Sequence, residues 1–219
     1  MFRKEISDLR SDSVISRNDL PSRRRNTDML IIDDEDFPAI ESLKRQNFNI
    51  TQKSDIDLLK DVEPYDIILC DVRGVGKNFG SEYGGAYISR EIKKNYPEKT
   101  VIIYSAQDSS MDYQQFYEYA DSRVPKGATI DEWISILDEH IDHAVDPIYQ
   151  WQKMRNLLLN AGVSINEVAN LESKYVKAVK SKNFSSFKKL QENRNNIIAN
   201  IAKSILVSLI CRLLTGGLS

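Results

Sequence analysis

Short runs of consecutive apolar residues recur along the first part of the chain. Residues 29–32, 67–70 and 101–104 are the clearest of them. Uninterrupted apolar runs of this length are typical of strands that are buried on both faces of a parallel sheet. Weaker strand patterns at 49–53 and 122–124 bring the predicted number of strands to five.

Between these strands, apolar residues recur at the spacing of amphipathic helices. The pattern predicts helices over 37–48, 55–62, 86–95, 111–119 and 130–144. Strand and helix therefore alternate throughout this region. The pattern predicts an α/β fold, a doubly wound parallel sheet with right-handed crossovers.

From Pro147 onward the pattern is helical only, so an all-α C-terminal region is expected. The predicted helices cover 148–160, 164–181 and 185–214. The last is mostly apolar over 197–214, but Lys203 and Arg212 interrupt it, and charges are unfavourable inside a bilayer. A buried or dimerising helix, and hence a homodimer, is favoured over a membrane-surface helix or a transmembrane span.

Charge divides the chain at about the same place. Residues 29–146 hold 12 basic and 24 acidic side chains, whereas 147–219 hold 11 basic and 3 acidic ones. The predicted organisation is a flexible arm over 1–28, with at most a short helix around 6–15, then a domain over 29–146 and a helical output or dimerisation region over 147–219. A basic tail is compatible with nucleic acid, an anionic membrane surface or an acidic protein as its partner.

The two cysteines, Cys70 and Cys211, lie far apart and have neither metal-ligand nor redox-pair spacing. The N-terminus lacks the apolar run of a signal peptide. These features predict a cytoplasmic protein.

Polar residues follow the predicted strands where each one ends. Asp33 and Asp34 follow the first strand, Asp71 the third, Ser105 the fourth and Lys126 the fifth. The carboxyl ends of parallel strands share one edge of the sheet, which is where ligands bind in open α/β folds. Converging carboxylates favour a hard cation such as Mg²⁺. Ser105 and Lys126 can bind phosphoryl oxygens, and an Asp carboxylate can accept a phosphoryl group.

These residues resemble the receiver domain of two-component response regulators. The resemblance covers about 29–146 and rests on four motifs in order: Leu30-Ile31-Ile32-Asp33-Asp34-Glu35, Ile67-Ile68-Leu69-Cys70-Asp71, Val101-Ile102-Ile103-Tyr104-Ser105-Ala106 and Val124-Pro125-Lys126. It implies a flavodoxin-like five-stranded sheet in the order 2-1-3-4-5. It also implies a histidine kinase or phosphotransfer protein as partner, and no enzyme activity beyond self-catalysed phosphoryl transfer and autodephosphorylation.

The resemblance also assigns roles to individual residues. Asp71 would be the phosphoacceptor. Mg²⁺ would be held by Asp33, Asp34, Asp71 and the main-chain carbonyl of Arg73. Ser105 and Lys126 would bind the phosphoryl group, with Ala106 and Gln107 beside them. Arg73 and Gln107 occupy the positions at which the family tunes dephosphorylation.

This sequence departs from the family pattern in three places. Lys126 is preceded by Pro125 and followed by Gly127, whereas the family has proline after the lysine. Arg123 occupies the position of the family's aromatic switch residue. The family's usual coupling, in which movement of the Ser/Thr side chain accompanies burial of the aromatic one, therefore cannot operate in its common form. The loop after Asp71 is longer than usual, and its five glycines match neither a Walker A motif nor a dinucleotide fingerprint.

Three functional hypotheses follow. The favoured one is a phosphorylation-dependent switch that controls a helical interaction or dimerisation module. The second is a DNA-binding regulator whose basic helices enter a groove, and a glycine followed by a capped helix at 162–168 is its weak motif. The third is a phosphorylation-independent receiver scaffold at a membrane.

Overall fold

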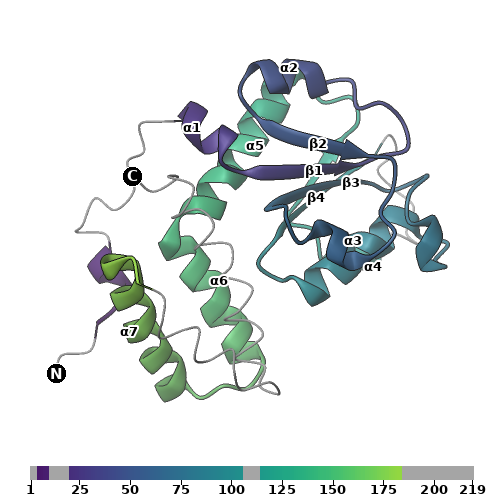
Figure 1. Cartoon of the computed structure of the whole chain (residues 1–219). Coiled ribbons are helices and arrows are strands. Elements are labelled where there is room, and N and C mark those ends of the chain that lie inside the picture. Colours follow the sequence, from purple (N-terminus) through teal and green to yellow (C-terminus); the bar gives the residue numbers. More distant parts are fainter. Residues whose placement is uncertain (1–3, 10–19, 106–113, 184–219) are drawn as a thin grey trace. The chain divides into compact units, whose positions relative to one another are not determined.

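The computed structural model describes three stretches of the chain, which are residues 4–9, 20–105 and 114–183 (Figure 1). The chain divides into two compact units. One unit is Leu20–Ile141, and the other combines Met1–Asp19 with Asp142–Ser219. The boundary therefore falls within a helix, a few residues before the charge step at Pro147.

The first unit is built on a five-stranded parallel sheet. Its strands are β1 (Asp28–Ile32), β2 (Asn49–Lys53), β3 (Ile67–Asp71), β4 (Thr100–Ser105) and β5 (Ser122–Pro125). Their order in the sheet is β2-β1-β3-β4-β5, and every neighbouring pair is parallel. The predicted fold class is confirmed, as is the predicted strand order.

Helices and short 3₁₀ turns precede, connect and follow the strands of this unit. They are α1 (Leu20–Arg25), α2 (Ile40–Arg45), the 3₁₀ turns η2 (Leu59–Val62) and η3 (Lys77–Phe79), α3 (Gly84–Asn95), α4 (Gln114–Tyr117) and α5 (Ile130–Val145). The helix predicted over 37–48 is shorter, because the chain turns at Asn47 with a φ of 69°. The helix predicted over 55–62 is only the turn η2.

The core forms on both faces of the sheet because the central strands are apolar throughout. All five residues of β3 are buried. On one face, alternate residues of β1 and β3 pack in one cluster with Ile88 and Ile92 of α3. On the other face, Tyr104 of β4 meets Trp133 of α5 edge-on, with ring centroids 5.8 Å apart. The sheet is therefore covered by helices on both sides, as its apolar strands require.

The N-terminal arm expected over 1–28 needs correction. Residues 20–28 belong to the sheet unit, because α1 leads directly into β1. Arg24 of α1 donates from Nε and Nη2 to the carboxylate of Asp138, at 2.8 and 2.6 Å. Its Nη1 donates to the carbonyl of Gln46, and its guanidinium lies over the ring of Phe48. These long-range contacts make α1 a structural part of the unit, which its local sequence did not indicate.

The second unit is helical in its described residues. Two helices, α6 (Pro147–Asn160) and α7 (Ile165–Ser181), pack with the 3₁₀ turn η1 (Ile6–Leu9) around a core that includes Trp151 and Tyr175. The hydroxyl of Ser164 accepts the amide of Glu167 at the start of α7. The helix predicted over 185–214 lies outside the described residues. Among the residues that are described, no helix is long and apolar enough to cross a membrane.

Candidate functional site

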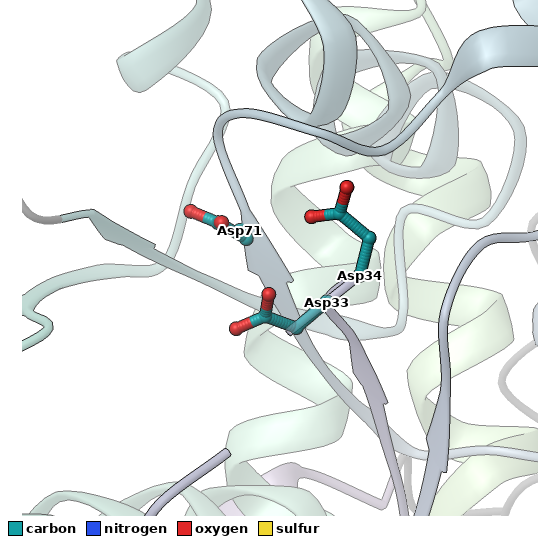
Figure 2. Close-up of side chains that lie close together, drawn as sticks. All are labelled: Asp33, Asp34 and Asp71. Atoms are coloured by element: carbon teal, nitrogen blue, oxygen red, sulfur yellow. The ribbon is translucent and has the colours of Figure 1, made fainter. Parts of the chain in front are cut away.

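Three carboxylates converge at the carboxyl edge of the sheet. Asp33 and Asp34 directly follow β1, and Asp71 is the last residue of β3 (Figure 2). Ile32, the last residue of β1, pairs with Cys70, the residue before Asp71, so the two strands end within one residue of each other. One oxygen from each carboxylate lies within 4.8 Å of the others. The three residues that the sequence placed at strand ends are therefore brought together.

Lys126, which follows β5, supplies positive charge to this cluster. Its ammonium lies 2.7 Å from Oδ2 of Asp71, 3.4 Å from Oδ2 of Asp33 and 3.5 Å from Oε2 of Glu35. Its amide donates to the carbonyl of Ser105, which ties this loop to the end of β4. Lys126 thus bridges acids from two different strands.

Burial and charge shift the pKa values of Asp71 and Lys126 in opposite directions. Burial raises the pKa of Asp71, and the hydrogen bond and charge of Lys126 only partly offset it. Burial lowers the pKa of Lys126, but the hydrogen bond and charge of Asp71 outweigh it, so the pKa is raised. The other oxygen of Asp71, Oδ1, accepts the amide of Val72 at 2.7 Å. Oδ2 is therefore the oxygen that pairs with the lysine, while Oδ1 is held by the backbone.

Asp33 is held by a residue that the sequence analysis did not single out. The hydroxyl of Tyr104, in β4, donates to Oδ2 of Asp33 at 2.7 Å, and both side chains are buried. Burial, together with this hydrogen bond, raises the pKa of Tyr104, so the hydroxyl stays protonated and remains a donor. A phenol in a strand buried on both faces needs a polar partner, and this was the available signal.

The glycine-rich loop after β3 also reaches the cluster. The ammonium of Lys77 lies 3.3 Å from Oδ2 of Asp34. Gly74, with a φ of 77°, lies so close to Asp34 that a side chain there would collide with the carboxylate. At the far end of the loop, a Cβ on Gly85 would overlap the carbonyl oxygen of Asp71. Glycine at these positions lets both the loop and α3 approach the acids closely.

The remaining predicted residues are placed as follows. Ser105 ends β4 and is half-buried. Arg73 is exposed two residues after Asp71, and the role of its carbonyl as a metal ligand stays a prediction. Ala106 and Gln107 lie outside the described residues. Arg123 is exposed on β5, and its guanidinium lies 5.1 Å from the ring centroid of Tyr117.

The acidic cluster fits a hard divalent cation. Its donors are carboxylate oxygens from Asp33, Asp34 and Asp71, the ligand type that Mg²⁺ and Ca²⁺ prefer. Three carboxylates this close repel one another, and two lysines provide the nearby positive charge. A bound cation would relieve the repulsion that remains.

Comparison of the sequence with known families and proteins does not assign the chain to a family. No family model matches the chain, and no curated protein matches it. Among solved structures, a CheY-like receiver domain from Methanospirillum hungatei is 18% identical and covers 53% of this chain and 94% of its own, with a TM-score of 0.43. A response regulator from Thermotoga maritima is 17% identical, covers 53% and 98%, and has a TM-score of 0.44.

A response regulator from Burkholderia pseudomallei, solved with a phosphorylated aspartic acid, a calcium ion and citrate, is also similar. It is 17% identical, covers 66% of this chain and 91% of its own, and has a TM-score of 0.41. The flavodoxin-like fold predicted for this region is confirmed by the sheet itself, through its strand order and all-parallel pairing.

Proposed function

We propose that this protein is a response-regulator-type signalling protein that is phosphorylated on Asp71 with Mg²⁺ and thereby controls its helical region. The observation that carries this proposal is the ammonium of Lys126, 2.7 Å from Asp71 and flanked by Asp33. A carboxylate with a lysine on one oxygen and two further acids beside it is equipped for phosphoryl transfer.

The chemistry assigned to the residues is an in-line displacement. An oxygen of Asp71 attacks the phosphorus of a donor, such as the phosphohistidine of a kinase or phosphotransfer protein. The bond between phosphorus and the donor breaks, and the leaving group keeps the electron pair and takes up a proton. Lys126 neutralises charge on the transferring group, and Ser105 donates a hydrogen bond to it. Mg²⁺, held by Asp33, Asp34 and Asp71, would supply further charge stabilisation when bound.

Treatment with acetyl phosphate and Mg²⁺ tests the proposal. Mass spectrometry should locate one phosphoryl group on Asp71, and Asp71→Asn should abolish the labelling. Asp66→Asn is the matched control, because Asp66 lies just before the other end of β3. Labelling at another residue, or labelling that EDTA leaves unchanged, would contradict the assignment.

We further propose that the C-terminal segment makes the protein a homodimer. The support is its sequence, in which large apolar residues share one helical stripe: Ile197, Ile198, Ile201, Ile205, Leu206, Leu209 and Leu213. Light scattering should find the full chain dimeric and a chain ending at Asn183 monomeric. A monomeric full-length protein would contradict the dimer.

A further inference from the structure

The loop between β3 and α3 is fastened to a neighbouring segment by hydrogen bonds. The amides of Gly76 and Lys77 donate to the two carboxylate oxygens of Asp55, at 2.8 and 3.0 Å. The side-chain amide of Asn78 donates to Asp57 at 2.6 Å. Three consecutive loop residues are therefore held by the segment that follows β2, so the backbone at Lys77 is fixed in position.

From this fixed backbone, the side chain of Lys77 extends to the acidic cluster. Its ammonium contacts Asp34, whose side chain is 33% exposed. Asp33 and Asp71 are only 2% and 7% exposed, and both of these acids pair with Lys126. The two lysines thus approach the cluster through different acids: Lys126 through the buried pair and Lys77 through the accessible one.

One carboxylate oxygen cannot form a close ion pair with an ammonium and coordinate a divalent cation at the same time. Mg²⁺ requires its oxygen ligands at about 2.0–2.1 Å and would repel an ammonium held next to the same oxygen. Mg²⁺ on either oxygen of Asp34 repels the ammonium near Oδ2, so the contact between Lys77 and Asp34 has to loosen when Asp34 becomes a metal ligand. A lysine on a tethered loop remains close after it is displaced, so it continues to compete.

We propose that Lys77 is a tethered counter-ion of Asp34 that competes with Mg²⁺ for this carboxylate, and that Asp55 keeps it within reach. The loop would then raise the Mg²⁺ concentration at which the site fills. This inference rests on the proposed function for the identity of the cation. It assigns a role to the long loop that distinguishes this chain from the receiver pattern.

Titration of the full-length protein with MgCl₂ tests the inference without any phosphoryl donor. Binding is followed by the backbone amide shifts of Asp33, Asp34 and Asp71. Lys77→Ala should bind Mg²⁺ about two- to fivefold more tightly than the wild type, the range that one exposed ion pair supports. Lys60→Ala is the matched control, since it removes the same charge from an exposed lysine on η2.

Asp55→Ala distinguishes two possible effects of Asp55 on Mg²⁺ binding: holding the loop that carries Lys77, and acting only through its negative charge. Loss of a negative charge near a cation site weakens cation binding if charge alone matters. If Asp55 acts by holding Lys77, its removal should instead tighten Mg²⁺ binding. Circular dichroism tests whether this variant is folded. If it is not, the comparison of Lys77→Ala with Lys60→Ala tests the inference by itself.

The possible outcomes are distinct. Tighter binding by Lys77→Ala but not by Lys60→Ala supports the inference. Equal Mg²⁺ affinity in the wild type and both lysine variants overturns it and leaves the proposed metal site standing. Shifts that stay unmoved at millimolar Mg²⁺ in every variant overturn both the inference and the metal part of the proposed function.

Discussion

Asp33 illustrates how single residues at this site are constrained. Its Oδ1 accepts the amide of Glu35, and its Oδ2 accepts the hydroxyl of Tyr104 and lies near Lys126. A buried carboxylate is stable only when its oxygens are hydrogen-bonded or paired. These three partners both permit the burial of Asp33 and fix its orientation toward the cluster.

Tyr104→Phe should therefore destabilise the protein. The variant keeps the aromatic packing against Trp133 but removes the hydroxyl that donates to Asp33. Loss of a hydrogen bond to a buried charged group is expected to lower the free energy of unfolding by about 1–3 kcal/mol. Urea denaturation measures the change. Tyr119→Phe, at an exposed position, is the control, and an equal effect in both variants would show that the bond to Asp33 contributes nothing.

At the scale of elements, α5 shows how a local motif sets a helix start. Glu132 accepts both the amide and the hydroxyl of Thr129, at 2.7 and 2.9 Å. In return, the amide of Glu132 donates to the Thr129 hydroxyl at 3.3 Å. This is a reciprocal capping box, and it places the start of α5 four residues after Lys126.

The cap predicts a pH-dependent stability. Hydrogen bonds from the backbone and side chain of Thr129 lower the pKa of Glu132 below its ordinary value of 4.5. The ionised form is therefore favoured in the folded state, so its stabilisation is present above the ordinary pKa and is lost as the pH falls through the lowered one. Glu132→Gln should melt at a lower temperature than the wild type at neutral pH, and the difference should close on acidification.

Thermal unfolding followed by circular dichroism between neutral and acidic pH measures this difference. The matched control is Glu139→Gln, the same exchange at an exposed position of α5. A pH-dependent difference of the same size in the control would assign the effect to net charge rather than to the cap.

The segment 55–62 shows the opposite case, in which hydrogen bonds to aspartate side chains, one set distant and one local, override a helical pattern. Ile56 and Leu59 have helical spacing, which predicted a helix. In the structure, the carboxylate of Asp55 is engaged by the loop after β3, and the carboxylate of Asp61 accepts the amides of Asp57 and Leu58. These hydrogen bonds hold the first half of the segment outside a helix, so only η2 forms.

At the scale of the whole molecule, the sheet unit should be separable, and α1 should be part of it. A fragment of residues 20–141 should unfold cooperatively, because its core is internal to the unit. A fragment of 28–141, which keeps β1 whole but lacks α1, should be less stable by about 1–3 kcal/mol, because it lacks Arg24 and leaves Asp138 without its partner. Urea denaturation of the two fragments compares them.

Point variants of the full chain provide the control for this prediction. Arg24→Ala should reproduce most of the loss, whereas Arg25→Ala should have little effect, because Arg25 is exposed and makes one long hydrogen bond to Asn47. Equal stability of the two fragments would show that α1 does not stabilise the sheet unit.

The sheet and the location of its site followed from local sequence. Four-residue apolar runs define buried strands, and acids immediately after them must gather at one edge, because all strands of a parallel sheet point the same way. Asp33, Asp34 and Asp71 were predictable for this reason. Lys126 was predictable as well, since it follows the last strand of the same sheet.

The contacts that complete the site could be found only in the folded chain. Tyr104 and Asp33 are 71 positions apart, Lys77 and Asp34 are 43 apart, and Arg24 and Asp138 are 114 apart. Periodicity reports which face of an element is buried but not which polar group meets another across a loop. Loop conformation depends on hydrogen bonds such as those of Asp55, and these exist only after the sheet has brought distant segments together.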